Sequence, residues 1–312
     1  MKINEIKERD MVNQPYLITS VKKGVQSNGS AYLSIVLQDN TGTLDARLWS
    51  VTPVQEEIMQ VGDVVQVEGV VNRFNQQLQM KITNIHSLAQ ASIDFKEFTV
   101  ASKVEKAVLI DALDYYLGLI ENDVLKNITQ TYFKRYEMEF FIYPAAARYH
   151  HEYVGGLATH TYEMLQIAES LGKIFPQLNM DLLYAGIICH DIGKINEFTS
   201  AQVVEYGTEG KLLGHISMSQ AEVFEISRIL GCEDCEEATL LRHMILSHHG
   251  QYEFGSPVLP MILEAEVLNM IDNLDARIDM FSKQLEQLDP GSFSPRVYSL
   301  ESRSVYKPLL DN

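Results

Sequence analysis

The first 90 residues alternate between apolar and polar positions, as half-buried β-strands do. Leu44, Ala46 and Leu48, for example, fall on one face of an extended segment. Turns with strong turn chemistry separate the segments, at residues 27–30, which contain Asn28-Gly29, and at residues 39–42. The expected strands span residues 16–21, 31–37, 44–49, 64–71 and 78–85, with a helical stretch at residues 54–59. This order predicts a small, partly open β-barrel.

The pattern changes to a helical period from Ser102 onward, after an aperiodic stretch at residues 92–100. Apolar residues then recur at spacings of three and four. The expected helices span residues 102–117, 124–136, 157–174, 180–191 and 264–280. One further helix is expected to begin near His215, and another is expected to end within residues 241–250. The helix at residues 180–191 is apolar on nearly every side, which predicts that it is the central, buried helix of a bundle.

The two patterns predict a multi-domain α and β protein, with an N-terminal β-barrel of the OB (oligonucleotide/oligosaccharide-binding) type followed by an all-α helical bundle. We expect the barrel at residues 1–90, a linker and leading helices at residues 91–150, the main helical domain at residues 151–290 and a C-terminal tail at residues 291–312.

Barrels of the OB type commonly bind single-stranded nucleic acid by stacking bases on aromatic side chains beside cations. The candidate residues for this contact are Lys22, Lys23, Tyr32, Arg47, Trp49, Arg73, Phe74 and Lys81. For any one of them the alternative is a place in the barrel core or a solvated surface position. Because cations gather in this segment while the rest of the chain is acidic, we expect the domain as a whole to contact nucleic acid.

Charge limits the kinds of partner. The chain has 25 Lys and Arg against 42 Asp and Glu, a formal net charge of −17, which argues against a broad, sequence-independent grip on duplex nucleic acid. A narrow basic groove or bound metal ions are compatible with it. No apolar run reaches the roughly 18 residues of a membrane span, the N-terminus lacks the layout of a signal peptide, and three cysteines make no disulfide framework. We therefore expect a cytoplasmic protein without membrane contact.

Two neighbouring ionisable residues, His190 and Asp191, end the helix predicted to be buried. Such groups are costly there unless they are paired or bound to metal, and imidazole and carboxylate together can hold divalent cations. One His-Asp dipeptide can arise by chance. Further candidates lie at helix ends or beside apolar seams: His160, His215, His248 and Asp272. One metal centre explains all six residues better than six coincidences do.

These motifs carry a family resemblance. The order His…His-Asp…His…His-His…Asp, with residues 155–160 and 190–194, resembles the HD-domain metal-dependent phosphohydrolases. With the OB-like domain, residues 212–216, 246–250 and 272–276 and the tail Tyr306-Lys307-Pro308, the whole chain resembles the YhaM family of 3′-to-5′ exoribonucleases. The resemblance implies an HD-domain helical bundle and a manganese-dependent enzyme of the bacterial cytoplasm that trims single-stranded RNA, and in some cases single-stranded DNA, from the 3′ end.

The resemblance also implies roles for individual residues around two divalent ions, expected to be Mn²⁺. His160, His190, Asp191 and Asp272 would hold one ion, and Asp191, His215 and His248 the other, with Asp191 as the bridge. Paired ions of this kind activate water for phosphodiester hydrolysis. The remaining catalytic candidates are Lys194, as a phosphate contact, and His249, which would reach a phosphate, a water or a further ion.

Several assignments stay open on the sequence alone. His150 and His151 would face the substrate or be hydrogen-bonded loop residues, Asp275 is expected to orient a ligand histidine, and His243 is expected at the surface. We expect a homo-oligomer, in which the aromatic residues at the end of the chain either pack against a neighbouring subunit or fold back. These residues are Phe281, Phe293, Tyr298 and Tyr306.

Two other functions compete with the exoribonuclease. One is an HD-type phosphohydrolase of nucleotides or cyclic nucleotides, although an OB-like domain has no obvious use with a small substrate. The other is a nucleic-acid-binding regulator with an inactive HD domain, against which the complete set of ligand residues argues.

Overall fold

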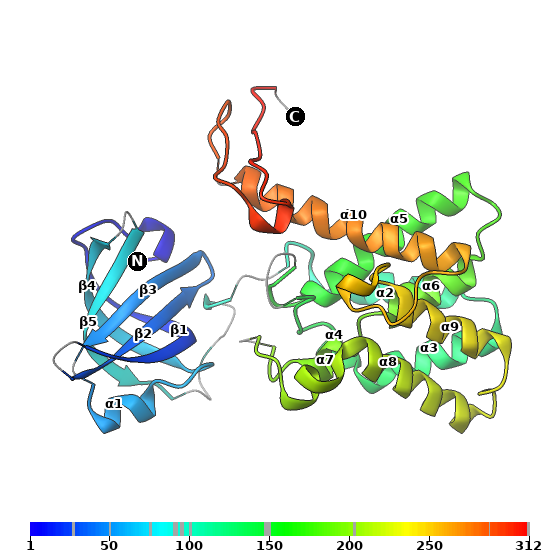
Figure 1. The fold of residues 1–312 in the computed structure, drawn as a ribbon, viewed down its shortest axis with the longest axis horizontal. Coiled ribbons are helices and arrows are strands. Elements are labelled where there is room, and N and C mark those ends of the chain that lie inside the picture. The colour runs from blue at the N-terminus through cyan, green and yellow to red at the C-terminus, as the bar shows by residue number, and fades with distance from the viewer. Residues whose placement is uncertain are drawn as a thin grey trace. The chain divides into compact units, whose positions relative to one another are not determined.

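A computed structural model describes residues 1–26, 29–49, 51–74, 77–89, 93, 97–99, 102–146, 151–201, 204–286 and 288–310. The chain forms two compact units, Met1–Ala101 and Ser102–Asn312 (Figure 1). The finer domain limits expected at residues 150 and 290 stay predictions. Ser27 and Asn28 of the expected turn, and the substrate candidate His150, lie outside the described residues.

The first unit is a closed five-stranded barrel with the strand order β1-β2-β3-β5-β4. Its strands are β1 (Met11–Val25), β2 (Ala31–Asp39), β3 (Gly42–Trp49), β4 (Val64–Phe74) and β5 (Gln77–Ser87). All pairs are antiparallel except β3 with β5, which is parallel. The prediction of an OB-type barrel is confirmed. The barrel is closed where a partly open one was expected, because β5 pairs with both β3 and β4.

The alternation of the strands determines the barrel core. On β3, Leu44, Ala46 and Leu48 are buried, while the residues between them face outward. The short helix α1 (Pro53–Ile58) follows β3, as predicted. It begins at Thr52, whose side chain accepts a hydrogen bond from the backbone N–H of Gln55 at 3.3 Å. The outer face of the strands is therefore available for a ligand.

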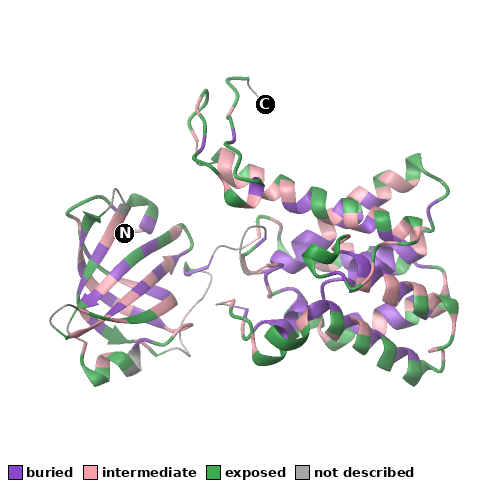
Figure 2. Ribbon diagram, in the orientation of Figure 1, coloured by how far each residue is buried: buried purple, intermediate pink, exposed green. Residues whose placement is uncertain are grey.

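The second unit is a bundle of helices, as predicted. Its helices are α2 (Lys106–Leu119), α3 (Asp123–Arg135), α4 (Glu137–Phe140), α5 (Gly156–Ile174), α6 (Met180–Cys189), α7 (Lys194–Glu197), α8 (Thr208–Leu230), α9 (Glu236–Ser247) and α10 (Leu263–Glu286). Every residue of α6 from Leu182 to Cys189 is buried (Figure 2). This helix contacts α2, α3, α5, α9 and α10, so it is the central helix that its sequence predicted. Among the described residues, no helix is long and apolar enough to cross a membrane.

Helix α8 starts earlier than expected and is broken inside. It begins at Thr208, and Gly214 interrupts it with φ 73° and ψ 151°. These angles lie in a region that is almost restricted to glycine. The break makes His215 the first residue of a new helical segment, so the expected helix start at His215 describes this second segment.

The apolar residues Val267, Ile271, Leu274 and Ile278 recur along α10, but only Val267 and Ile271 pack against the core of the bundle. Ile271 is buried, whereas the side chains of Leu274 and Ile278 are 47% and 54% exposed. The buried face of α10 includes an acidic residue, Asp275, together with Ile271 and Ala276. Apolar residues therefore lie on both sides of this helix.

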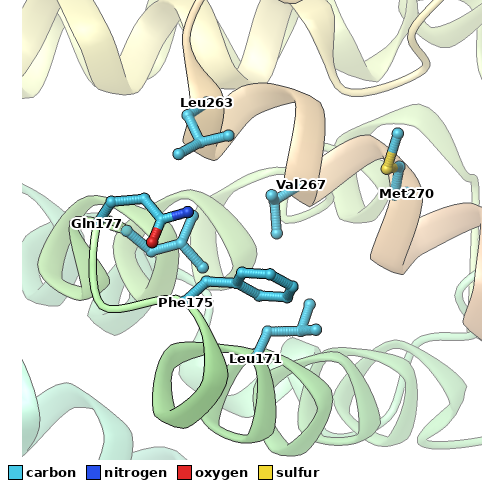
Figure 3. A pocket seen from close by; sticks show the side chains of 7 residues that line it. Leu171, Phe175, Gln177, Leu263, Val267 and Met270 are labelled. Atoms are coloured by element: carbon cyan, nitrogen blue, oxygen red, sulfur yellow. The ribbon is translucent and has the colours of Figure 1, made fainter.

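Near its N-terminal end, α10 forms an apolar hollow of about 280 Å³ with the C-terminal end of α5 (Figure 3). Its lining residues are Leu171, Phe175, Gln177, Leu178, Leu263, Val267 and Met270. None of them is ionisable, so this hollow takes no part in metal chemistry.

The C-terminal tail folds back along α10. Phe293 forms a β-bridge with Tyr306, and their rings lie 4.8 Å apart. Arg277 on α10 forms an ion pair with Glu301 at 2.7 Å. The tail aromatics remain largely exposed, with Tyr298 at 87%, so the expectation of a homo-oligomer stays a prediction.

Candidate metal centre

Six side chains predicted as metal ligands converge on one buried place in the second unit. His160 is the fifth residue of α5, His190 and Asp191 directly follow α6, and His248 directly follows α9. His215 begins the second segment of α8, and Asp272 lies on α10. All are buried except Asp272, whose side chain is 17% exposed.

Asp191 is at the centre of this cluster. Its Oδ2 lies 3.2 Å from Nε2 of His190 and 3.9 Å from Nε2 of His160. Its Oδ1 lies 3.6 Å from Nε2 of His215 and 3.7 Å from Nε2 of His248. Asp272 Oδ1 is 3.2 Å from Nε2 of His160. The two oxygens of one carboxylate thus face two separate pairs of histidines.

Each of the four imidazoles is fixed through its other nitrogen. Nδ1 of His190 and of His248 donates to the backbone oxygen three residues earlier, at 2.7 and 2.8 Å. Nδ1 of His160 lies 2.6 Å from Asp275, as expected for a residue that orients a ligand histidine, and Nδ1 of His215 lies 3.0 Å from Glu197. Fixing Nδ1 in this way turns Nε2 toward the centre, which is the arrangement of metal-ligating histidines.

The donor atoms fit a divalent cation. Within the described part of the chain, Nε2 of His190, His215 and His248 and Oδ1 of Asp191 are buried without a hydrogen-bond partner. A buried polar atom left unpaired costs about 1–3 kcal/mol, so four of them together require an explanation. Imidazole nitrogens and a carboxylate oxygen are the donors that Zn²⁺, Mn²⁺ and Fe²⁺ accept. A bound cation would satisfy all four atoms.

The surroundings of the cluster shift the pKa values of its carboxylate and of one of its imidazoles. Burial alone would raise the pKa of Asp191, but the charges of His190 and Lys194 outweigh it and hold that pKa well below the ordinary value. Burial, with the nearby His249, lowers the pKa of His248 well below the ordinary value. A carboxylate that stays ionised and an imidazole that stays neutral are the forms that bind metal.

Lys194 and His249, the other catalytic candidates, both line a cleft of about 280 Å³ beside the cluster. Lys194 is 9% exposed and donates a hydrogen bond to Oδ2 of Asp191 at 2.6 Å. Nδ1 of His249 donates to the backbone oxygen of Phe254 at 2.7 Å. Phe254, Asn269 and Asn273 also line this cleft. No charge or motif in the sequence distinguishes Phe254 and Asn269 as residues of a site, and Asn273 stands out only as part of the motif at residues 272–276.

Two further histidines of the helical unit, His151 and His243, form hydrogen bonds within the fold. His151 is buried, with Nε2 2.8 Å from Asp275 Oδ2 and Nδ1 2.8 Å from the Tyr153 hydroxyl. Its surroundings correspond to the hydrogen-bonded loop histidine, one of the two alternatives. His243 is partly buried and accepts a hydrogen bond from the backbone N–H of Met261 at 3.0 Å.

The candidates on the barrel fall into two groups. The first, which we call the stacking face, consists of Lys22, Tyr32, Arg47, Trp49 and Lys81. Tyr32 pairs with Trp49 across β2 and β3, and their rings lie 5.0 Å apart. The Arg47 guanidinium lies 5.7 Å from the Tyr32 ring, and Arg47 pairs with Lys81. Lys22 pairs with Ser34, which in turn pairs with Arg47. The stacking face is thus continuous across β1, β2, β3 and β5.

The second group, Lys23, Arg73 and Phe74, does not pair across strands with residues of the stacking face. Lys23 forms an ion pair with Glu56 at 2.6 Å, and Arg73 forms one with Glu8 at 3.5 Å. Phe74 is 62% exposed at the end of β4. The alternative of a place in the barrel core is therefore wrong for all three aromatic candidates, since Tyr32 is half-buried and Trp49 is 42% exposed.

The fold and the cluster define a class of protein. A family model described as HD domain matches residues 157–277, and one described as OB-fold nucleic acid binding domain matches residues 17–88. The chain is thus an HD-domain hydrolase, a class that depends on divalent metal, joined to an OB-fold.

Three similar proteins share the name 3'-5' exoribonuclease YhaM. The chain is 40% identical to the one from Geobacillus sp. over 304 residues, 97% of this chain and 94% of that protein. It is 40% identical to those from Bacillus subtilis over 300 residues and Listeria monocytogenes over 296, covering 95% or more of this chain and 94% or more of theirs. The chain belongs to the YhaM family of 3′-5′ exoribonucleases.

Proposed function

We propose that this protein is a metal-dependent 3′-to-5′ exoribonuclease that hydrolyses the phosphodiester bonds of single-stranded RNA, and also accepts single-stranded DNA. The observation that carries the proposal is the convergence of His160, His190, His215, His248 and Asp272 around Asp191. Its membership of the YhaM family supports the direction and the substrate.

Two divalent ions, proposed to be Mn²⁺, would occupy the cluster. His160, His190, Asp191 and Asp272 would hold one, and Asp191, His215 and His248 the other. The placement of Asp191 supports its role as the bridge, because Oδ2 faces the first pair of histidines and Oδ1 the second. Such ions supply water activation and neutralise the charge that develops on the phosphate.

The cleft beside the cluster is where we place the 3′-terminal nucleotide. Lys194 is the cation in its wall and would contact a phosphate oxygen, with His249 beside it. Phe254 is 60% exposed and offers a ring on which any base can stack. An enzyme that removes nucleotides one after another needs such a base-tolerant contact. Replacing Phe254 with Ala is expected to raise KM for RNA about tenfold or more, with a smaller change in kcat.

The stacking face of the barrel would bind the same strand farther from its 3′ end. Tyr32 and Trp49 offer aromatic rings, and Lys22, Arg47 and Lys81 offer charges for the phosphates. This division places the positive charge where the strand binds, although the whole chain is acidic.

The most direct test is digestion of end-labelled single-stranded RNA, matched with DNA of the same sequence, in Mn²⁺ and in Mg²⁺. We expect stepwise release of mononucleotides from the 3′ end in Mn²⁺. Hydrolysis of mononucleotides or cyclic nucleotides without digestion of the oligomer would instead indicate the small-molecule phosphohydrolase. Protein that contains no metal after supplementation with Mn²⁺ would indicate the inactive regulator.

A further inference from the structure

The four histidines around Asp191 are not held in the same way. Backbone oxygens hold Nδ1 of His190 and His248, whereas carboxylates hold the other two. Asp275 holds His160 and Glu197 holds His215. Each half of the proposed centre therefore contains one histidine held by a carbonyl and one held by a carboxylate.

Glu197 contacts His215 twice. Oε1 accepts a hydrogen bond from the backbone N–H of His215 at 3.2 Å, and Oε2 lies 3.0 Å from its Nδ1. The break at Gly214 leaves that backbone N–H at the start of a helical segment, where it has no carbonyl of its own helix to bond. One buried carboxylate thus caps the segment and orients the ring of its first residue.

The chain packs closely around this contact. A Cβ atom on Gly210 would lie 2.3 Å from the backbone oxygen of Glu197, and one on Gly193 would lie 2.7 Å from the backbone oxygen of His215. The backbone N–H of Gly193 donates to the Ser219 hydroxyl at 3.1 Å. Helix α7, which carries Lys194 and Glu197, is therefore held directly against α8 on both sides of the break at Gly214.

We infer that Glu197 is the positioning residue for the ion that Asp191, His215 and His248 would hold. Its carboxylate directs Nε2 of His215 toward Oδ1 of Asp191. The inference rests on the proposed function, because it requires a metal centre at this cluster. It goes beyond that function in giving each half of the centre its own carboxylate, Glu197 for one and Asp275 for the other. Loss of a carboxylate behind a ligand histidine typically costs about 10- to 100-fold in metal affinity.

Calorimetric titration of the full-length protein with Mn²⁺ tests this. We expect two ions in the wild type, and in Glu197→Gln one ion at wild-type affinity and the other weakened about 10- to 100-fold. Glu197→Ala should weaken the same ion further, since glutamine keeps one oxygen for His215. RNA cleavage by both variants should need more Mn²⁺ and recover at high Mn²⁺, with KM for RNA unchanged.

The control is Glu222→Gln on α8, the helix that also carries His215. Glu222 accepts hydrogen bonds from the Tyr136 hydroxyl at 2.8 Å and from Asn196 at 3.0 Å, and joins α3, α7 and α8 without contacting a proposed ligand. The Glu222→Gln variant should bind both ions as the wild type does. Wild-type affinity for both ions in Glu197→Gln and in Glu197→Ala would overturn the inference. Weakening of both ions by the same factor would also overturn it. A wild-type protein that binds no Mn²⁺ would instead contradict the proposed function.

Discussion

At the scale of single residues, Asp191 has the least freedom to change. It lies within 4 Å of four histidines and of Lys194, and it is 2% exposed. Its importance comes from charge as well as position, since a buried carboxylate kept ionised by its neighbours is what a cation requires.

Replacing Asp191 with Asn tests that charge with little change of shape. We expect RNA hydrolysis to fall by roughly 10⁴-fold or more, because an amide cannot bridge two cations as a carboxylate does. Binding of single-stranded RNA should persist, since the stacking face is untouched. Cleavage and filter-binding assays measure the two effects. Wild-type cleavage by this variant in Mn²⁺ would refute the role of Asp191.

The pH dependence of metal binding follows from His160. Burial lowers its pKa, but hydrogen bonds with Asp272 and Asp275 outweigh burial and raise it to about 10. Without metal the ring is therefore protonated at neutral pH, and an ion on Nε2 must displace that proton. Affinity for Mn²⁺ should rise with pH up to about 10, by about tenfold per pH unit for one proton.

Calorimetry at pH 7.5 in two buffers with different ionisation enthalpies would measure the proton released with the first ion. Binding that releases no proton and does not vary between about pH 6.5 and 8.5 would show this account of His160 to be wrong.

At the scale of elements, helix ends and one internal helix break place most of the proposed ligand side chains. His190 and Asp191 follow the end of α6, His248 follows the end of α9, and His215 follows the break in α8. Helix ends bring side chains to the middle of a bundle without introducing charges along a buried helix face. Helix α10 differs in that it supplies acidic groups, Asp272 and Asp275, from its middle.

Replacing Gly214 with Ala tests the break. Because φ is 73° and ψ is 151°, a side chain there should cost about 1–3 kcal/mol of unfolding free energy. Weaker Mn²⁺ binding should accompany the loss, as His215 shifts. Denaturant unfolding and metal titration measure both.

The matched control is Gly118→Ala in α2, where an added Cβ meets nothing within 4 Å and φ is not positive. It should leave Mn²⁺ binding unchanged and increase stability by up to about 1 kcal/mol. If Gly214→Ala behaved like this control, the break would not matter for the site.

At the scale of the whole molecule, the two units are expected to perform different steps. The barrel would bind the strand and the helical unit would hydrolyse its end, so a change in one should alter a different kinetic constant from a change in the other.

Replacing Trp49 with Ala should therefore raise KM for a long single-stranded RNA, by an amount that corresponds to about 1–3 kcal/mol. Hydrolysis of a dinucleotide, which leaves no further nucleotides for the barrel to bind, should be unchanged. Met11→Ala, an exposed apolar residue of β1 outside the stacking face, is the control and should match the wild type on both substrates. Equal loss on the long and the short substrate would argue against a separate strand-binding role for the barrel.

The sequence by itself determined the barrel, most of the helices and the six convergent residues. The reason is that alternation and helical period record which side of a segment is buried, and ionisable residues at the end of an apolar helix such as α6 need a partner. The YhaM resemblance supplied the proposed assignment of these residues to two ions.

Only the tertiary structure decided which distant segments meet. Glu197 and His215 are 18 residues apart, and Asp275 and His151 are 124 apart, so no local pattern connects them. The same is true of the closure of the barrel by β5 and of the outward face of α10. Each depends on a neighbour contributed from elsewhere in the chain, and hydrophobic periodicity carries no information about that neighbour.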